Sequence, residues 1–565
     1  MKKLFTVCLF ATLLISCQAK EKDPIKVSDQ IRLNQVGYHP SAVKEFILAD
    51  LSGTGFDLVD TDKKVVFSGI LVDQGTWETS GEKVMIGDFT EFNTPGTYHI
   101  IVDGKTSSYP FDIKNNIYEP ALHAAIKSYY FQRASMPIEE SYGGIYKRAA
   151  GHPDDACIYH PSSGKSKGTL NSPGGWYDAG DYGKYIVNAS LSVGEMLLLL
   201  EQFPDAISDG DLNIPESGNG ISDLWDELKY ELDWILTMQD EDGGVYFKLT
   251  PLGFGGFIMP EAYDLDRYII GKTTTSTLDF SAVLAQAARL YKNIDPDWSA
   301  KALDASKKAW KWAEKNNDIT FKNPEDVSTG QYGDSEFSDD FFWAASELFL
   351  ATKNDMYKSA MAEHKQDYQH QLADSWMHFV RNVGFHSLLE NQDDLDAEMS
   401  EKLTTGHLAL ADEILQKISA HPYHIALDSF VWGSNSDILN QALILCVAHR
   451  ISGEEKYLHG AEQITDYIFG KNATGYSFIT GFGTKKVMFP HHRPSGADGI
   501  ADPVPGFILG GPNNDRQDAH DVTYSSEFAA KAFMDVEPSF ASNEVCINWN
   551  APAVYVLGYL QQVRK

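Results

Sequence analysis

Two aspartates three residues apart stand in a glycine- and aromatic-rich stretch that is suited to chemistry. They are Asp178 and Asp181 in GGWYDAGDYGKYIVN, residues 174–188. Glycines let the backbone turn tightly, and Trp176 and Tyr182 offer flat faces on which sugar rings stack. Two close carboxylates can hold one water molecule while one of them accepts its proton. A calcium loop, or a turn with capping aspartates, would show the same pattern, so both alternatives stay open.

A second group of polar residues lies near the C-terminal end. Hydrolysis of a glycoside requires a distant acid, and Glu544 in SFASNEVCINWNAPAVYVLGYL precedes an apolar helix pattern. A helix N-terminal cap would explain Glu544 without catalysis. His491 and Arg493 lie on the loop FPHHRPSG, where zinc is a poor fit because the ligand spacing is wrong and Arg493 would repel a cation. Hydrogen bonding to sugar hydroxyls is the better interpretation.

The pattern of apolar and turn-forming residues along the chain predicts two domains that must position these residues. Residues 30–113 contain short β-rich runs separated by Gly, Asp, Asn and Pro, which indicates a small immunoglobulin-like β-sandwich. Residues 114–565 contain helical patterns separated by long loops rich in Gly, Pro, Trp and Tyr. Loops of that length in a helical body are usually functional. We therefore expect a helical barrel whose loops line a cleft.

The first 29 residues are interpreted as an export signal and a tether. An apolar run too short to span a bilayer follows Met1–Lys3, and Leu14–Ser16 before Cys17 resemble a bacterial lipoprotein cleavage box. Residues 1–17 would then be a signal peptide that leaves Cys17 acylated, and residues 18–29 a polar tether. The alternative is a simple cleaved signal. We expect an exported protein that is lipid-anchored at the outer membrane, with the N-terminal lipid as its membrane contact.

The net charge limits the kinds of ligand to be expected, and the cysteine content bears on disulfide bonds. The formal net charge of −32 argues against nucleic acid and favours a neutral ligand. Beyond the signal, Cys157, Cys446 and Cys546 are widely spaced and odd in number, so no disulfide framework is evident.

Four ordered motifs resemble the signatures of one enzyme family. GGWYDAGDYGKYIVN, SFITGFGTKKVMFPHHR, PGFILGGPN and NEVCINWNAP are similar to successive motifs of glycoside hydrolase family 9, the cellulase family with an (α/α)6 barrel. IRLNQVGYHP and FNTPGTYHIIVDG resemble the immunoglobulin-like module that precedes many of its catalytic domains. The resemblance covers nearly all of the chain beyond the signal. It implies an all-β sandwich followed by an all-α barrel, and an inverting hydrolase.

The resemblance also implies residue roles. Asp181 corresponds to the family's catalytic base, and Asp178 to the companion that helps hold the attacking water. Glu544 corresponds to the proton donor, which must stay protonated near the working pH and therefore needs a raised pKa. His491 and Arg493 match residues that contact substrate.

Two positions depart from the family pattern. Trp549 stands where some members have Tyr, which keeps a stacking surface for substrate but moves the polar group. Phe247 precedes Lys248 where many members have His, which calls one sugar hydrogen bond near the cleaved bond into question.

Metal sites are considered separately, because the chemistry requires no cofactor. Some relatives bind zinc ahead of the DAGD motif, but GHPDDACIYH offers only His152, Cys157 and His160, so structural zinc is not expected. DSEFSDDFFWAA resembles a family calcium loop with oxygen donors from three residues. These are Ser335, Asp339 and Asp340. The alternative for this segment is an acidic helix N-terminus.

The leading hypothesis is an endo-β-1,4-glucanase acting on neutral, soluble, cellulose-like glucans: cello-oligosaccharides, mixed-linkage glucan or xyloglucan. The alternative is an exo-acting cellodextrinase, β-glucosidase or glucosaminidase of the same family. A glycan-binding lipoprotein with a dead site is disfavoured because Asp181 and Glu544 are both present. A polysaccharide lyase is disfavoured because it predicts an anionic substrate. No carbohydrate-binding module is visible, so crystalline cellulose is not the expected substrate.

Overall fold

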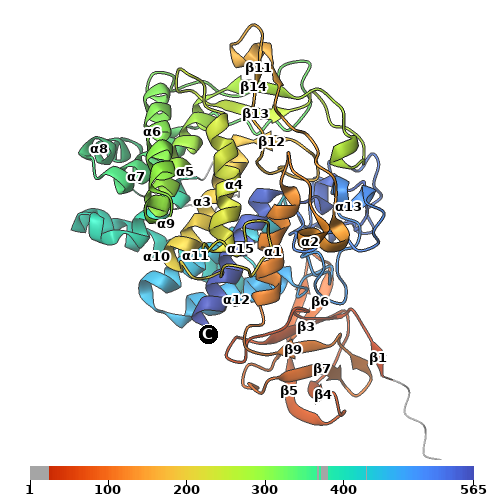
Figure 1. Cartoon of the computed structure of the whole chain (residues 1–565). Coiled ribbons are helices and arrows are strands. Elements are labelled where there is room, and N and C mark those ends of the chain that lie inside the picture. The colour runs from red at the N-terminus through yellow and green to blue at the C-terminus, as the bar shows by residue number, and fades with distance from the viewer. Residues whose placement is uncertain (1–24, 366–367, 369, 371–379, 428) are drawn as a thin grey trace, which may run out of the picture.

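The β-rich runs of the N-terminal region form the two layers of a small sandwich (Figure 1). The structure is a computed structural model, and it describes residues 25–365, 368, 370, 380–427 and 429–565. The strands are β1 (Lys26–Val27), β2 (Ile31–Arg32), β3 (Glu45–Ala49), β4 (Gly55–Asp60), β5 (Val65–Trp77), β6 (Glu82–Asp88), β7 (Gly96–Val102), β8 (Thr106–Ser107) and β9 (Phe111–Ile113). Strand β5 joins the layers, because its first half pairs with β4 and its second half with β6. The core between the layers includes Phe46, Leu58 and Ile100.

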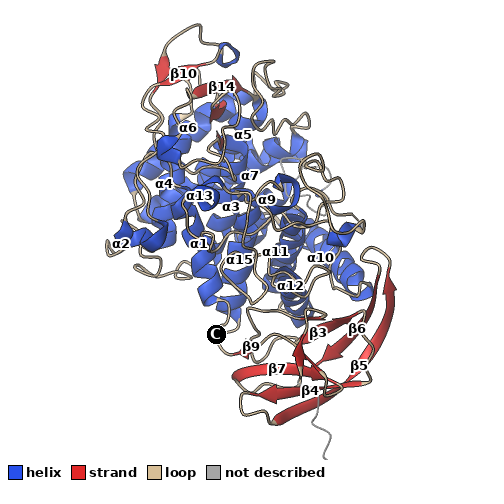
Figure 2. Ribbon diagram, turned by 90° about the vertical axis from the view of Figure 1, so that its right-hand side faces the viewer, coloured by secondary structure: helices blue, strands red, loops and turns tan. Residues whose placement is uncertain are grey.

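The helical patterns form a barrel with inner and outer helices (Figure 2). The helices are α1 (Glu119–Gln132), α2 (Glu140–Gly143), α3 (Ile186–Gln202), α4 (Asp223–Thr237), α5 (Thr274–Leu290), α6 (Pro296–Ala313), α7 (Ser338–Thr352), α8 (Asp355–His364), α9 (Arg381–Glu390), α10 (Ala397–Ala420), α11 (Ser434–Ser452), α12 (Glu455–Ile468), α13 (Arg493–Ala497), α14 (Phe540–Asn543) and α15 (Ile547–Val563). Helices such as α3 and α5 are buried on nearly all sides, as expected of apolar inner helices. Outer helices such as α6 and α10 bury one face. This confirms an all-β immunoglobulin-like domain followed by an all-α (α/α)6 barrel.

The inner helices are neighbours in chain order. Helices α3, α5, α7 and α9 contact one another in sequence, and α15 contacts both α11 and α3, so the ring closes between its first and last members. Each of these inner helices except the last packs against the outer helix that follows it in the chain, for example α5 against α6 and α11 against α12. The loops that join the hairpins are therefore delivered to the ends of the barrel.

A five-stranded sheet covers one end of the barrel, where the sequence predicts only loops (top of Figure 1). Its strands, in spatial order, are β11 (Thr169–Leu170), β10 (Cys157–Tyr159), β14 (Tyr268–Lys272), β13 (Tyr246–Thr250) and β12 (Lys184–Tyr185). Strand β12 follows the DAGD motif directly and pairs with β13. The sheet thus fixes the backbone that carries Asp181.

The two domains meet through a buried polar and aromatic contact. Arg32 donates hydrogen bonds to Glu82 (2.9 Å) and to the hydroxyl of Tyr423 (2.8 Å), and that hydroxyl donates to Glu82 (2.8 Å). Lys531 of the barrel forms an ion pair with Glu82 at 2.8 Å. Trp77, at the end of β5, packs its ring 4.8 Å from that of Tyr423. The sandwich is therefore anchored to the barrel by specific contacts.

The predicted N-terminal signal and the membrane contact concern a part of the chain that precedes the first strand. Residues 1–24, with the signal peptide and Cys17, lie outside the described residues. Among the helices that are described, none combines the length and the hydropathy needed to cross a bilayer. Cys157, Cys446 and Cys546 are buried free thiols.

Candidate active site

Three motifs far apart in the sequence are joined by backbone hydrogen bonds into one frame. The bonds run from Ile547 N–H to Asp178 O (2.8 Å), from Arg493 N–H to Gly180 O (3.0 Å) and from His491 N–H to Asn543 O (2.9 Å). A Cβ atom at Gly180 would lie 2.0 Å from the carbonyl oxygen of His491, so only glycine lets the DAGD turn approach this closely. The frame therefore fixes Asp181 and Glu544 relative to each other.

A cavity of about 650 Å³ opens over this frame. Five of the site residues expected from the sequence line it: Asp181, His491, Arg493, Glu544 and Trp549. Further lining residues are aromatic or carry neutral polar groups: Tyr185, Phe254, Asn323, Ser328, Thr329, Gln331, Tyr332, Trp432, Phe540 and Cys546. Such a mixture of flat apolar faces and hydroxyl or amide groups suits a neutral sugar.

Asp178 does not line the cavity but is held rigidly beside it. Its Oδ1 accepts a hydrogen bond from Asn188 (2.9 Å), and its Oδ2 accepts one from the hydroxyl of Tyr332 (2.8 Å). Burial, together with the nearby charge of Asp181, raises the pKa of Asp178 to about 7, and both hydrogen bonds oppose this rise. The two donors fix the orientation of this carboxyl group.

The two carboxyl groups in the cavity differ in their electrostatic surroundings. Burial raises the pKa of Asp181, while Arg493 and the backbone N–H of Gly183 lower it. Burial raises the pKa of Glu544 well above its usual value, and the charge of Asp181 raises it further. Oδ1 of Asp181 is buried without a hydrogen-bond partner among the described residues. The arrangement provides one protonated acid and one carboxylate oxygen able to accept a proton.

His491 and Arg493 reach the cavity with different hydrogen-bonding capacity. Nδ1 of His491 donates to the carbonyl of Glu537 (2.7 Å), which leaves Nε2 as an acceptor, and burial lowers the pKa of this ring to about 4. Arg493 donates to the carbonyl of Gly255 from Nε (3.1 Å) and Nη2 (3.0 Å), and to that of Gly180 from Nη1 (2.8 Å). Arg493 thus fixes two loops as well as placing a positive charge in the cavity.

Trp176 and Tyr182 do not lie where the sequence predicts, on a surface that could stack on sugar. Trp176 is 1% exposed, and its indole donates to Glu227 of α4 (2.9 Å) and packs 4.5 Å from the ring of Tyr129 of α1. The hydroxyl of Tyr182 donates to the carbonyl of Ile258 (2.6 Å). Neither residue lines the cavity, because the turn presents its aspartate there and directs its flanking aromatics into the packing between helices and loops.

The two departures from the family pattern lie in different places. Trp549 lines the cavity, as a stacking residue must. Phe247 is buried away from it and stacks on Phe321, with ring centres 3.9 Å apart. The amino group of Lys248 donates to Asn323 (2.8 Å) and to the carbonyl of Gly330 (2.7 Å). Lys248 therefore supports the loop that forms one wall of the cavity.

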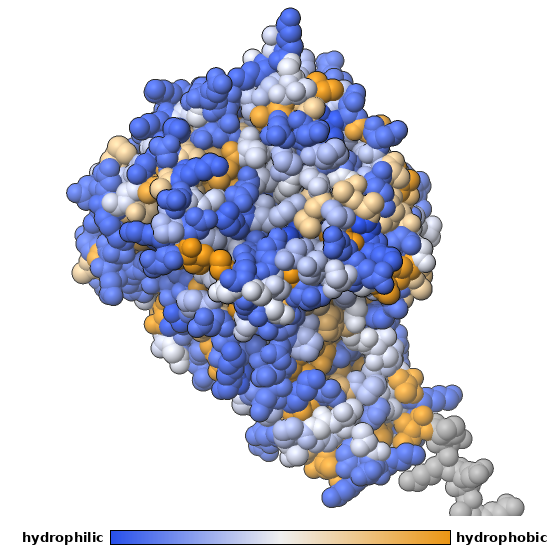
Figure 3. Space-filling view, viewed as in Figure 1, coloured by the Kyte–Doolittle hydropathy of each residue, from blue (hydrophilic) through white to orange (hydrophobic). Residues whose placement is uncertain are grey.

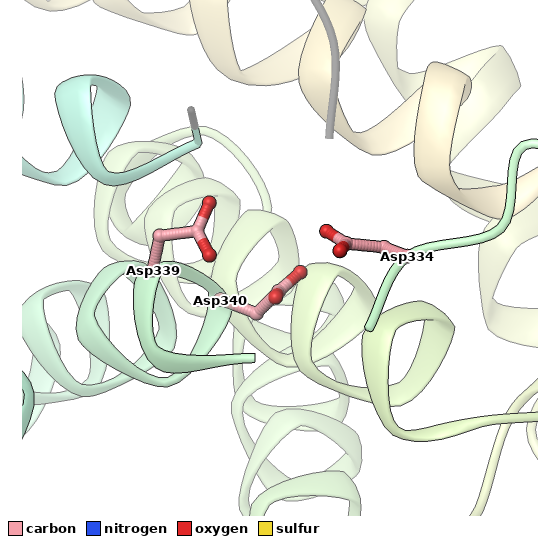
Figure 4. A group of neighbouring side chains, drawn as sticks. All are labelled: Asp334, Asp339 and Asp340. Atoms are coloured by element: carbon pink, nitrogen blue, oxygen red, sulfur yellow. The ribbon is translucent and has the colours of Figure 1, made fainter. Parts of the chain in front are cut away.

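A separate group of buried carboxylates could hold a metal ion (Figure 4). Asp334, Asp339 and Asp340 offer ligand oxygens that all lie within 4.8 Å of one another, and their carboxyl groups face a common space. The expected donor Ser335 is exposed and does not belong to this group. The preceding residue, Asp334, turns inward instead and accepts a hydrogen bond from the N–H of Glu336 (2.8 Å). Both carboxylate oxygens of Asp339 are buried without a partner among the other described residues.

The residues considered for zinc have other partners. Nδ1 of His152 lies 2.7 Å from the hydroxyl of Tyr177, and Nδ1 of His160 lies 2.8 Å from that of Ser162. In the described part of the chain, His152, Cys157 and His160 do not form a group that could hold a metal ion.

Several site residues were missed by sequence reasoning. Asn188 and Tyr332 orient Asp178, and Trp432 and Phe540 line the cavity. Asn188 ends the GGWYDAGDYGKYIVN stretch, one helical turn after β12, so its place in the motif is a local signal that could indicate its role. Tyr332 and Trp432 belong to loops whose approach to the cavity no local pattern indicates.

Comparison with known proteins agrees with this geometry. The model for Glycosyl hydrolase family 9 matches residues 118–557, and that for the Cellulase N-terminal ig-like domain matches residues 26–107. The Xyloglucan-specific endo-beta-1,4-glucanase BoGH9A of Bacteroides ovatus is 39% identical over 561 residues, which cover 93% of each chain. Endoglucanase D of Acetivibrio thermocellus is 34% identical over 545 residues, covering 95% of this chain and 84% of the relative.

A solved structure, Bacteroides ovatus GH9, superposes with a TM-score of 0.89 at 37% identity and covers 95% of this chain and all of that one (100%). The match thus includes the sandwich, the barrel and the loops that carry the carboxyl groups. The chain belongs to glycosyl hydrolase family 9 and is a glycoside hydrolase with an N-terminal cellulase-type immunoglobulin-like domain.

Proposed function

We propose that this protein is an endo-acting hydrolase of internal β-1,4-glucosidic bonds in soluble glucans, and that it inverts the anomeric centre. The observation that carries the proposal is the frame of three backbone hydrogen bonds, because it presents Asp181 and Glu544 together in one cavity. Asp181 and Glu544 come from opposite ends of the barrel's sequence and line the same sugar-sized cavity. Glycoside hydrolysis requires such a pair of carboxyl groups.

In the proposed reaction, Glu544 gives its proton to the leaving glycosidic oxygen as the bond from that oxygen to the anomeric carbon breaks. A water molecule attacks the opposite face of the sugar and gives a proton to Asp181, so one C–O bond breaks and one forms. Asp178 helps to hold the water. The raised pKa of Glu544 keeps this group protonated, and the positive charge of Arg493 favours ionised Asp181.

The substrate class follows from the lining and from the relatives. Among the cavity-lining residues, aromatic side chains such as Trp432 are the largest group, and Asn323 and Gln331 add neutral amides. The view in Figure 3 shows a largely hydrophilic face with apolar groups in small separate patches, in keeping with the net charge of −32. The name of the Bacteroides ovatus relative states xyloglucan specificity, and we propose xyloglucan and unbranched soluble β-1,4-glucan as substrates of this chain.

Early product analysis tests the function. Mixed-length products from xyloglucan and soluble β-glucan would support endo action, whereas one constant short product would replace it by exo action. Proton NMR of freshly formed products shows which anomer the enzyme releases.

We expect Asp181→Asn to lower kcat about 10²–10⁴-fold, the contribution typical of a general base. Asp304→Asn, on the outer surface of α6, is the matched control. Wild-type activity in Asp181→Asn would show that the base is misassigned.

We further propose that Asp334, Asp339 and Asp340 hold a structural calcium ion. Carboxylate oxygens are the hard ligands that calcium prefers, and the absence of nitrogen or sulfur from this group disfavours zinc. Asp279 of α5 lies beside Asp340 and adds to the negative charge. The ion would tie the N-terminus of α7 to the loop before it and takes no part in the reaction.

Export and lipid anchoring through Cys17 are also proposed, on the sequence of the N-terminal signal. Membrane fractionation after labelling with palmitate tests this. The label and the membrane association should both be lost in Cys17→Ala, and an unlabelled wild-type protein would contradict the proposal.

A further inference from the structure

An exposed phenylalanine stands at the rim of the catalytic cavity. Phe254 lines the cavity, yet 51% of its surface is exposed. It lies on the loop between β13 and β14, where Ile258 is also exposed and Phe257 is half-buried. Phe254 thus places apolar surface at the rim of the cavity, where a bound ligand would bury it. The mechanism proposed above gives Phe254 no role.

Arg493 fixes this loop relative to the carboxyl groups. Its guanidinium carbon lies 5.7 Å from the ring centre of Phe254 and 5.5 Å from that of Phe257. The same guanidinium donates to the carbonyl of Gly255 and to that of Gly180, the residue before Asp181. Tyr182 adds a further tie, since its hydroxyl donates to Ile258 on the same loop. Phe254 is therefore held at a set position outside the reacting centre.

Aromatic rings continue from this loop across the cavity. The ring of Phe257 lies 5.0 Å from His491, His491 lies 6.0 Å from Phe540, and Phe540 lies 5.5 Å from Trp432. The backbone of His491 pairs with that of Glu544, and both residues line the cavity. Phe254, Phe540 and Trp432 all line the cavity. Several flat faces in one cavity suit an extended chain of sugars better than a single short one.

We propose that Phe254 is a specificity residue that stacks on a sugar beyond the two joined by the cleaved bond, and so favours long β-1,4-glucan chains over short ones. The proposal rests on the proposed function and deepens it. A phenylalanine has no polar group to act on the reacting atoms, so its contact is apolar stacking on the flat C–H face of a sugar. Such a contact stabilises the ground state and the transition state alike, and its loss is expected to raise KM rather than lower kcat.

Kinetics on cello-oligosaccharides of increasing length test the proposal. We expect Phe254→Ala to lower kcat/KM about tenfold, through KM, on chains long enough to reach the rim. On the shortest cleaved chain and on an aryl cellobioside, kcat/KM should be unchanged. Phe254→Trp should restore the preference for long chains. Phe489→Ala is the matched control, because Phe489 is 58% exposed but does not line the cavity.

Two outcomes would overturn the proposal. Equal loss at every chain length would mean that Phe254 acts through Arg493 as a support, and no loss at any length would mean that no sugar contacts it. Calorimetric binding of the same oligosaccharides to Asp181→Asn, with and without Phe254→Ala, separates this inference from the proposed function. If the wild type cleaves no β-1,4-glucan but Phe254→Ala still weakens binding of long chains alone, the proposed function fails and the binding role stands.

Discussion

At the scale of single residues, the surroundings rather than the residue type separate the roles of the carboxyl groups. Asp178 and Asp181 belong to one turn, yet Asp178 has both oxygens hydrogen-bonded to neutral donors and Asp181 has one oxygen without a described partner. Burial raises the pKa of Glu544 well above its usual value, the charge of Asp181 raises it further, and that of Arg493 lowers it. These differences support the proposed roles of Glu544 as acid and Asp181 as base.

The pH profile tests this assignment. With Asp181 as base and Glu544 as acid, kcat/KM should rise with pH as Asp181 ionises and fall as Glu544 ionises. Arg493 lowers both pKa values, because a positive charge favours each carboxylate. Arg493→Gln should therefore move both limbs of the profile to higher pH. Arg493→Lys keeps the charge and serves as the control, with limbs near their wild-type positions. Limbs that do not move in Arg493→Gln would contradict the assignment.

At the scale of elements, the hairpins of the barrel bring loops from remote parts of the chain to one end. The cavity walls come from the DAGD turn, the segment after β13, the loop before α7, the loop before α11, the start of α13 and the stretch from α14 to α15. Asp339 and Asp340 lie in the first turn of α7, and Asp334 lies just before it. Since Tyr332 reaches Asp178 from the same loop, the proposed calcium ion would stabilise one wall of the site.

Thermal unfolding tests this metal site. Calcium added to chelator-treated protein should raise Tm, because an ion present at 100 times its Kd adds about 2.7 kcal/mol to the stability of the folded state. Asp340→Asn should abolish the rise, and without calcium it should not lower Tm, because it removes one of several neighbouring negative charges. Asp304→Asn on α6 should keep the full response. A calcium response that survives unchanged in Asp340→Asn would contradict the assignment.

At the scale of the whole molecule, the sandwich supports the barrel. Arg32, Tyr423 and Lys531 converge on Glu82, whose side chain is 2% exposed. Trp77 packs on Tyr423, which belongs to the same segment of the barrel as the cavity residue Trp432. The sandwich therefore acts on the stability of the site from outside, while substrate choice belongs to the loops of the barrel.

Removal of Glu82 tests this coupling. Glu82→Ala leaves the buried Arg32 without its ion-pair partner and should destabilise the protein by about 3 kcal/mol, seen as a lower Tm. The ratio of activities on xyloglucan and unbranched glucan should stay unchanged. Asp73→Ala is the control, because its pair with Lys83 is half exposed on both sides and such surface pairs contribute little to stability. Equal Tm values for the two variants would contradict a supporting interface.

How much the sequence predicts depends on whether the signal is local. The two domain types follow from the spacing of apolar residues, and GGWYDAGDYGKYIVN and NEVCINWNAP mark the carboxyl groups before any fold is known. Trp176 and Tyr182 show the limit: an aromatic residue beside a catalytic turn has the same pattern whether it faces the substrate or the core. Ser335 shows it again, because neighbouring oxygen donors differ only in which way the loop turns them.

The sequence by itself determined the order of the domains, the family motifs and the identities of Asp181 and Glu544. Tertiary structure alone decided that Tyr332 and Asn188 orient Asp178, that Asp334 replaces Ser335, and that Phe254 remains exposed at the rim. The physical reason is that residue type and short-range periodicity are written along the chain. The contacts that set burial, hydrogen-bond partners and pKa depend on how the backbone turns and on residues as far apart as Tyr332 and Asp178, 154 positions from each other, which only the closed barrel brings together.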